Sequence, residues 1–321
     1  MCIRDSIEFR ASGALQAIQT DAQYERSRDN VLSLKSNGYC VDLLGASDAR
    51  AIEPELSPEL AGAVHYPMRA QADPVKATRA FADAARGAGA EVLTGREVTG
   101  ITPISSGAYQ LDCPGESHSA RQLVLAAGAW CGPLGEMLGL RIPVIPVRGQ
   151  MWATESMTPR VFHSLSAAES PTHWSASPGN DSETPPELTH LGSRRVTRHL
   201  YGRQNRDGEV IFGGDREMAG YDKAVDAAGI EVNFGHTREI LPFLEGHSIS
   251  RTWAGLMPFS LDGKPIIGRV PERENLYIVS GLASSGFGRG PMAGKLIADY
   301  IHTGHPPPVL RESDPARFSP S

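Results

Sequence analysis

Cysteine is scarce in this sequence and widely scattered. The four cysteines, Cys2, Cys40, Cys113 and Cys131, include no CxxC pair. This pattern argues against a disulfide framework and against a cysteine-based metal site. Free thiols fit a reducing compartment, so we expect a cytoplasmic protein.

Long apolar runs are also missing. The longest stretch, residues 123–129, is far too short to cross a bilayer. Residues 1–10 have no apolar core flanked by positive charge, and residues 1–6 match no strand or helix pattern. The sequence therefore predicts no integral membrane segment and no secretory signal.

The sequence also lacks an excess of basic residues. Lys and Arg number 31 against 37 Asp and Glu, which gives a formal net charge of −6. This balance argues against nucleic acid as a principal partner. The ten histidines show no ligand spacing beyond His302 and His305, which lie in a polar terminal stretch, so no metal site is expected.

The residues that are present predict a globular α/β protein. Hydrophobic residues make up 40% of the chain, enough for one large domain or two. Thr20-Asp21 predicts a capped helix reaching residue 37, and Asp73-Pro74 predicts another, with Asp as N-cap and Pro in the first turn. Further helices are expected from residue 47 and over 130–140, 231–241 and 293–302.

Strand patterns divide the chain into three parts. Residues 144–154 and 200–213 alternate as in an antiparallel sheet, whereas 123–127 is a continuous apolar run, typical of a buried parallel strand. The order predicts an α/β domain that is interrupted by an antiparallel sheet and then resumed. Other strands are expected over 7–18 (two short strands around a Ser-Gly turn), 62–66, 91–93, 98–101 and 109–111.

Two glycine-containing segments carry the strongest functional signal. Residues 281–290 are rich in glycine, and Pro291 is expected to begin the helix that follows. Bare backbone and a helix N-terminus, with its partial positive charge, suit a flat ligand that gains negative charge. A mobile loop before a core helix is the alternative. Upstream, the run LVLAAGAW (residues 123–130) ends a strand in small residues, which let backbone approach a ligand.

With the segment from Trp253 to Gly268, these motifs resemble the FAD-dependent amine and amino-acid oxidoreductases of the D-amino-acid oxidase, glycine oxidase and sarcosine oxidase superfamily. The resemblance runs over residues 7–302. It implies an FAD-binding, Rossmann-like domain with an interleaved antiparallel-sheet substrate domain. The implied parts are substrate domain 7–72 and 141–250, FAD-binding domain 73–140 and 251–305, and a polar tail 306–321. Residues 164–193 read as an insertion, either a lid or poorly ordered.

The resemblance also implies site residues. The cofactor-binding candidates are Ala127, Gly128, Trp130, Gly255, Gly281, Ser285, Gly286, Phe287 and Gly288. The catalytic candidates are Tyr201, Arg203 and Arg251. Tyr201 falls where glycine oxidases place a tyrosine beside the substrate, and an arginine is suited to gripping a carboxylate with two parallel hydrogen bonds. Tyr201 and Arg203 share a strand face, which points either to substrate or to solvent.

The chain departs from its relatives at three places. Met257 and Ser284 stand where glycine oxidases have arginines, so the substrate is expected to be an N-alkyl amino acid or secondary amine rather than plain glycine, unless another arginine takes over. The opening G-x-G-x-x-G strand and helix are missing, so the chain is expected to be N-terminally truncated, without its first βαβ unit.

Three functions follow as hypotheses. The first is FAD-dependent oxidation of the C–N bond of an amino acid or amine to an imine by hydride transfer to flavin. The second is a fragment or remnant that no longer binds FAD. The third keeps the flavin but passes electrons to a partner subunit or quinone rather than to O₂.

Overall fold

The computed structural model describes residues 6–104, 107–169, 199–271 and 273–318. The strands are β1 Ala14–Ile18, β2 Asp42–Gly45, β3 Gly62–Tyr66, β4 Gly100–Ile104, β5 Ala108–Cys113, β6 Glu116–Ala120, β7 Leu123–Leu125, β8 Val144–Thr154, β9 Ser164–Ala167, β10 Tyr201–Gln204, β11 Val210–Gly213, β12 Ile249–Ser260, β13 Ile266–Arg269 and β14 Leu276–Ser280. The α-helices are α2 Asp21–Ser36, α3 Ala46–Ile52, α4 Pro74–Gly87, α5 Cys131–Glu136, α7 Ala227–Ile240 and α8 Gly286–Thr303. Short 3₁₀ helices are η1 Gly128–Trp130, η2 Pro242–Leu244, η3 Ala283–Ser285, η4 Pro308–Ser313 and η5 Pro315–Phe318.

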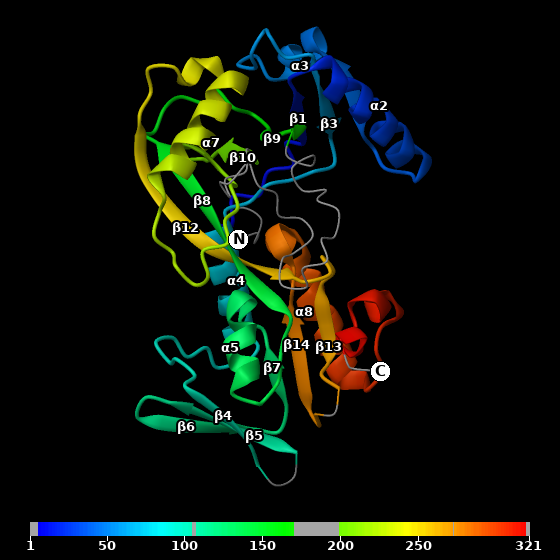
Figure 1. Cartoon of the computed structure of the whole chain (residues 1–321), viewed down its shortest axis with the longest axis vertical. Helices are drawn as coiled ribbons and strands as arrows, with labels where there is room; N and C mark the ends of the chain where they lie inside the picture. Colours follow the sequence, from blue (N-terminus) through cyan, green and yellow to red (C-terminus); the bar gives the residue numbers. More distant parts are fainter. Residues whose placement is uncertain (1–5, 105–106, 170–198, 272, 319–321) are drawn as a thin grey trace.

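An eight-stranded sheet fills the upper part of the molecule (Figure 1). Its strand order is β12-β8-β11-β10-β9-β1-β3-β2. All neighbours are antiparallel except β1 and β9, which run parallel. Strands from the start of the chain therefore share one sheet with strands from its middle, as the interleaved organisation predicts.

The two faces of this sheet are covered unequally. On one face, α7 and α3 pack over a core in which Trp152 and Phe212 are fully buried. The Trp152 indole N–H donates to Asn233 Oδ1 at 2.8 Å. On the other face, α2 packs over the β1–β3–β2 end, where Val31 lies against Ile18 and Val64.

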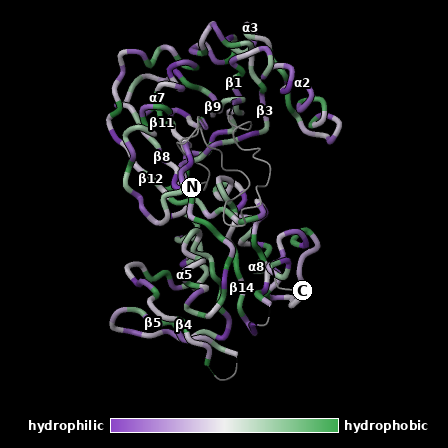
Figure 2. The backbone as a smooth tube through the Cα atoms, viewed as in Figure 1, coloured by the Kyte–Doolittle hydropathy of each residue, from purple (hydrophilic) through white to green (hydrophobic). Residues whose placement is uncertain are grey.

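The lower part of the molecule holds two smaller sheets (Figure 1). One has the order β13-β14-β7, with β7 parallel to β14, and α8 packs on it through Ala293 and Ile297. The hydrophobic run of β14 stands out in Figure 2. The other sheet is the meander β4-β5-β6. The parallel pairing confirms the strand expected at residues 123–127, although the strand itself ends at Leu125.

The capping residues predicted from the sequence mark the starts of α2 and α4. Thr20 accepts a hydrogen bond from the Gln23 backbone N–H at 3.2 Å, and Asp73 accepts one from the Lys76 backbone N–H at 2.8 Å. Both residues cap the helices predicted from them, α2 and α4. Strands 62–66 and 144–154 also have the predicted bounds.

Several predicted elements were wrong. Residues 164–167, assigned to the insertion, form β9 in the middle of the large sheet, because Leu165 and Ala167 are buried there. The rest of that insertion falls mostly outside the described residues. Residues 7–18 contain one strand, β1, preceded by a single bridge from Arg10 to Gln71. No strand forms at 91–93, and β6 was missed.

Both later helices begin earlier than predicted. Asp226 caps α7 by accepting from the Ala228 and Gly229 backbone N–H groups, so that helix starts before residue 231. The helix α8 begins at Gly286 and contains Pro291, which was expected to start it. Pro291 is the sixth residue of α8, beyond the first N–H groups that lack an intrahelical acceptor, so it removes the hydrogen bond that its N–H would make to the Phe287 carbonyl.

Residues 307–318 pack on the lower part of the molecule. Leu310 is buried against α8 and β13, and Arg317 forms an ion pair with Asp262 at 2.6 Å. The strand β12 runs through the predicted domain boundary at residue 251 and belongs to the large sheet along its whole length. The division into domains at residues 73, 141, 251 and 306 stays a prediction.

Candidate active site

Among the described residues, α2 is the helix on the second face of the large sheet, and the part of this face beyond α2, which we call the open face, is the natural place for a ligand. Strand alternation and register put Trp253, Met151 and Tyr201 in one cross-strand row on this face. A second row contains Arg251 and Arg203. Further along β12 the same face carries Gly255, then Met257, then Phe259.

This face ends at the glycine-rich segment. Met257 and Phe259 pack with Val147, Met218 and Ala283, and Ala283 belongs to η3, directly before α8. Ala283 has φ of 49°, a left-handed conformation that is costly for a residue with a side chain. The loop is therefore held in a defined conformation between the large sheet and α8.

The loop is also tied to the other glycine-containing segment. Ser280, the last residue of β14, donates from its hydroxyl to the Gly128 carbonyl at 2.9 Å. Gly281 follows with φ of 68°, which only glycine adopts readily. This bond brings the two segments that suggested a cofactor, residues 123–130 and 281–290, to the same edge of the small sheet.

The residues present fit a flat cofactor. A Cβ added to Gly128, Gly255 or Gly288 would meet no atom within 4 Å, so the backbone there faces open space. Gly286 opens α8, an 18-residue helix whose first N–H groups are available to an electron-rich edge. We therefore expect the bare backbone at Gly128, Gly255 and Gly288, which we call the glycine cradle, to hold the ring system of the cofactor.

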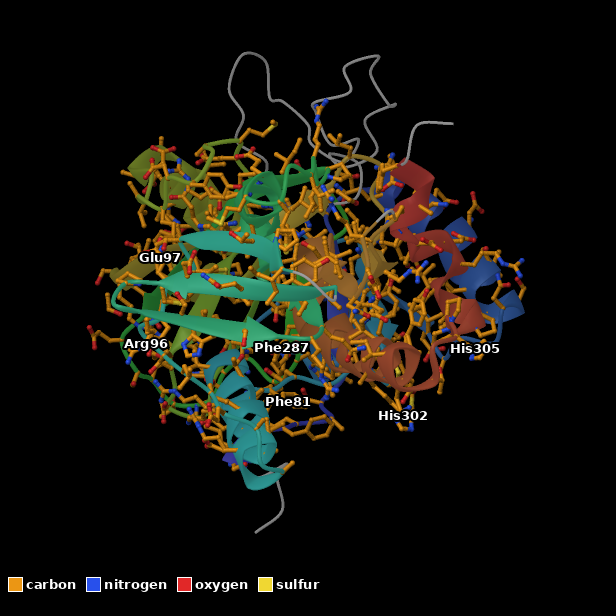
Figure 3. The ribbon with its side chains drawn as sticks, turned by 90° about the horizontal axis from the view of Figure 1, so that it is seen from below. Phe81, Arg96, Glu97, Phe287, His302 and His305 are labelled. Atoms are coloured by element: carbon orange, nitrogen blue, oxygen red, sulfur yellow. The ribbon has the colours of Figure 1, made fainter. Side chains whose placement is uncertain are left out.

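The other cofactor candidates surround the same place. Ala127 precedes η1, and Ser285 ends η3. Trp130 is 43% exposed and lies 6.0 Å from the Tyr221 ring, centroid to centroid. Phe287 is about half exposed in the first turn of α8 (Figure 3), and not in a loop as predicted. In the same view His302 and His305 lie well away from it.

Tyr201 and Arg203 both stand on the open face but in different surroundings. Tyr201 is 48% exposed, whereas Arg203 is only 7% exposed. Arg203 lies close enough to Arg10 to contribute, after burial, to a lowered pKa of the Arg10 guanidinium. The two residues therefore offer one accessible hydroxyl and one buried positive charge.

Arg251 is engaged elsewhere. Its Nε and Nη2 atoms each donate to the Glu209 carboxylate at 2.8 Å, and its guanidinium lies 4.5 Å from the centre of the Trp253 ring. The hydrogen bond raises the pKa of Arg251 and lowers the pKa of Glu209. A side chain paired in this way is poorly placed to receive a substrate carboxylate.

Sequence reasoning missed the polar residues that follow β11. Arg148 forms an ion pair with Glu217 and another with Asp222 at 3.1 Å, so its charge joins β8 to the segment after β11. Asp215 accepts from the Gln150 backbone N–H at 2.7 Å and from its side-chain amide at 2.6 Å. Arg216 donates to the Ser284 hydroxyl at 2.8 Å. The signal was the charged run Asp-Arg-Glu directly after a strand ending in Gly-Gly.

Asp215 should make the stability of the protein pH-dependent. Burial raises its pKa from 3.8 to about 6. A raised carboxyl pKa stabilises the fold below the unfolded value, and this contribution is lost as the pH rises through the folded value. Relative to Asp215→Asn, the wild type should lose about 1–2 kcal/mol of unfolding free energy between about pH 5 and about pH 8.

Urea unfolding of both proteins at the two pH values checks this expectation. Taking the difference between them cancels the other titrating groups and any constant cost of the amide. A difference that stays constant with pH would show that Asp215 does not titrate in this range.

Within residues 6–104, 107–169, 199–271 and 273–318, no three His, Cys, Asp or Glu side chains are grouped to hold a metal ion. No helix in those ranges is both long and apolar enough to cross a membrane.

Comparisons with known proteins agree on one family. The family model described as FAD dependent oxidoreductase, or DAO, matches residues 3–300. The HcnC subunit of hydrogen cyanide synthase from Pseudomonas aeruginosa is 29% identical over 316 residues, covering 98% of this chain and 68% of its own length. Glycine oxidase from Geobacillus kaustophilus is 29% identical over 265 residues, covering 82% of this chain and 62% of the enzyme.

The same fold is found among solved structures. The crystal structure of glycine oxidase from Geobacillus kaustophilus superposes with a TM-score of 0.83 and 23% identity, covering 99% of this chain and 79% of that one. At this identity the likeness shows the fold. The chain thus spans roughly two thirds of the length of the curated relatives described above.

Proposed function

Because the chain belongs to the FAD-dependent oxidoreductase (DAO) family, we propose that it oxidises the C–N bond of an amino acid or a secondary amine to an imine. The observation that carries the proposal is the meeting of the open sheet face with the glycine cradle of Gly128, Gly255 and Gly288. FAD, when bound, supplies the redox chemistry by accepting a hydride from the substrate carbon. The protein is left to bind, orient and exclude water.

The chain's own residues divide this work. The first turn of α8 would face the edge of the ring system that becomes electron-rich, where a helix N-terminus stabilises negative charge. Gly128 and Gly255 let backbone approach closely. We assign Tyr201 and Arg203 to the substrate side, since both stand on the open face. We leave Arg251 out of the site because its guanidinium is paired with Glu209.

The experiment is an anaerobic titration of the flavin-loaded protein with a panel of amino acids and secondary amines. Loss of the oxidised flavin absorption band with at least one of them is expected. Imine hydrolysis should then release ammonia or an amine together with a carbonyl product. A protein that binds FAD but is reduced by none of these compounds would contradict the proposal.

The electron acceptor is a separate question. The relative HcnC is named as a subunit of its enzyme, and this name favours transfer to a partner as a second possibility beside O₂. Aerobic turnover that yields hydrogen peroxide would indicate an oxidase. Turnover only with an added dye or quinone would indicate a dehydrogenase. The hypothesis of a non-catalytic remnant gains no support from the comparisons.

Tyr201 provides a direct test of the substrate side. Tyr201→Phe removes one accessible hydroxyl, and Arg203→Gln removes the buried charge beside it. Each should lower kcat/KM about two- to tenfold or more, the range of one lost hydrogen bond, with flavin content unchanged. Tyr39→Phe, on an exposed tyrosine in the turn that follows α2, is the control. Wild-type kinetics in both variants would remove the pair from the site.

A further inference from the structure

We propose that Arg10 and Arg203 form an anion-binding site at the end of the large sheet that lies away from the cofactor loop. The site would take a compact oxyanion, either free phosphate or sulfate or the acidic end of a longer ligand. The proposal does not depend on the proposed function, because anion binding is measured without turnover. It gives the buried charge of Arg203 a ligand of defined chemistry.

The strand register sets the distance of this site from the cofactor loop. Arg203 shares its cross-strand row with Arg251. Met257, where the open face meets η3, lies six residues further along β12. Six residues of a strand span about 20 Å. A compact anion bound at Arg203 therefore does not reach the loop before α8.

The side chain of Arg10 continues the edge of β10 beyond its pairing with β9. That pairing joins β9 to Tyr201 and Gly202. Two residues further along β10, the Gln204 carbonyl accepts a hydrogen bond from Arg10 Nη2. The Arg10 backbone is fixed by two hydrogen bonds with the Gln71 backbone, each of 2.8 Å. Arg10 is therefore held beside β10 through both its backbone and its side chain.

Arg203 brings a second guanidinium to the same place. It precedes Gln204 on β10, lies on the open face and is 7% exposed. Among the residues that the structure describes, no acceptor bonds to the Arg203 guanidinium or to the buried Nε of Arg10. An arginine offers five N–H donors, and a buried donor without an acceptor is costly. Donors from two side chains are thus left for a ligand.

The charges around these two groups are mostly positive. Burial lowers the pKa of Arg10, and the charges of Arg203 and Arg206 lower it further. Glu8 raises this pKa and is the smallest of the four causes. Glu8 is buried and forms an ion pair with Lys76, so its carboxylate is shared with another cation. An anion between Arg10 and Arg203 would offset a repulsion that burial keeps water from screening.

The frame that carries the two guanidinium groups is held in place by Gln204. Its buried side-chain carbonyl accepts from the Arg160 backbone N–H at 2.7 Å and from the Val161 backbone N–H at 3.0 Å. Its amide group donates to the Gly208 carbonyl at 2.8 Å. These bonds fix β10 on both sides of the loop that follows it. A site on a fixed frame loses little conformational freedom when it binds a ligand.

The test measures anion binding by the purified full chain. Sodium phosphate and sodium sulfate are titrated by calorimetry at one pH, with sodium chloride at the same ionic strength as the reference, because salt alone screens charges. The wild type should bind at least one of the two oxyanions. Arg203→Gln should bind it at least about tenfold more weakly, the effect of one lost hydrogen bond to a charged group. Arg203→Lys should fall between, because it keeps the charge and loses the fork. A wild type that binds neither oxyanion would overturn the proposal.

Arg273→Gln is the matched control. Like Arg10, Arg273 donates from Nη2 to a backbone carbonyl, that of Leu138, and within the described chain its buried Nε has no acceptor. It lies between β13 and β14, in the lower part of the molecule. Its anion binding should equal that of the wild type. Equal weakening in Arg273→Gln and Arg203→Gln would show a general effect of lost positive charge, and the site would be wrong.

Thermal unfolding separates a ligand site from a structural arginine. Without phosphate or sulfate, Arg203→Gln should unfold at the same temperature as the wild type or higher, because it removes one of two neighbouring buried positive charges. With the oxyanion added, the wild type should gain stability and the variant should gain less. A variant that is less stable than the wild type by the same amount in both conditions would show a structural role and contradict the proposal.

A last comparison identifies the source of the anion, and it alone rests on the proposed function. Amino acids whose side chains end in a carboxylate, in a series of increasing length, are compared with amides of the same length. If a substrate supplies the anion, Arg203→Gln should lower kcat/KM for the long acids by about tenfold or more relative to their amides. If the anion is free, this ratio should not change. Should no amine reduce the flavin while phosphate or sulfate binding still depends on Arg203, the site stands and the proposed reaction fails.

Discussion

Trp152→Ala should destabilise the protein by about 3–5 kcal/mol, the usual cost of removing a large aromatic side chain from a core. Trp152 is fully buried and lies between two aromatic rings, with centroid distances of 5.8 Å to Phe212 and 4.8 Å to Phe234. It joins the large sheet to α7, so the variant loses packing on both sides. Urea unfolding monitored by far-ultraviolet circular dichroism measures the change.

The polar contact of the same indole adds to the loss. Its N–H donates to Asn233 Oδ1, and Asn233 in turn donates to the His199 carbonyl at 3.0 Å. Trp152→Phe separates the two contributions, because it keeps a ring and leaves the Asn233 oxygen without this donor. We expect it to cost about 1–3 kcal/mol, the penalty for a buried polar group that loses its partner.

Trp253→Ala is the matched control. Trp253 lies in β12, directly across from Met151 on the open face, and is only partly buried. Its replacement should cost markedly less than that of Trp152, about 1–2 kcal/mol for the smaller area returned to water. Equal losses at the two positions would mean that the open face is as tightly covered as the face under α7.

The sequence was sufficient to predict helices and strands that depend on residues within or next to them. A cap side chain and a proline sit within a few residues of the helix they start, so Asp73-Pro74 identified α4. The alternating apolar residues of 144–154 likewise identified β8. A continuous apolar run was enough to predict β7 as a parallel strand, since burial on both faces removes alternation.

Helices and strands that depend on contacts with distant parts of the chain were not predictable in this way. β9 is short and polar at alternate positions, and it is a strand because β1 and β10 lie on either side of it. The start of α8 was missed because glycines and a proline disfavour a helix locally. Its apolar side packs on β13 and β14, and this packing outweighs the local preference.

The same difference between local and distant contacts applies to the residues of the candidate site. Glycine-rich segments are visible in a sequence because a ligand needs bare backbone there, so residues 128 and 281–288 could be proposed from the sequence, and their role in binding a cofactor stays a prediction. The contact between Arg216 and Ser284 could not be proposed in this way, because the two residues are 68 apart in the chain. Arg251 looked equally suitable in the sequence and proves to be paired with Glu209, a contact that only the register of β11, β8 and β12 creates.

Gly281→Ala, in the loop between β14 and η3, is expected to lower flavin binding. Gly281 has φ of 68°, and an added Cβ would lie 3.2 Å from the Ile266 backbone nitrogen and from Ser260 Cβ. An alanine in this conformation costs about 1–2 kcal/mol. The loop can relieve that strain only by moving away from the position it has between Ser280 and η3.

If FAD binds only when the loop has its present conformation, the strain of alanine at position 281 weakens FAD binding by the same free energy. A cost of about 1–2 kcal/mol corresponds to roughly a five- to thirtyfold higher Kd for FAD. The measurement is fluorescence titration of flavin-free protein with FAD, together with the flavin content after purification. Thermal unfolding of the flavin-free protein reports how much of the cost falls on the fold itself, because Gly281 is buried and its added Cβ would lie against Ile266 and Ser260.

Gly290→Ala is the control that tests whether the conformation at Gly281 matters for FAD binding. Gly290 lies inside α8, in the same glycine-rich run, and an added Cβ would meet nothing within 4 Å. Alanine is the better helix former by about 0.5–1 kcal/mol, so this variant should be at least as stable as the wild type and bind FAD equally well. Should both variants lose flavin to the same degree, the effect would belong to the glycine content of the run in general. Should neither lose it, the conformation at Gly281 would have no part in holding the cofactor, and the cradle would have to be sought elsewhere on the open face.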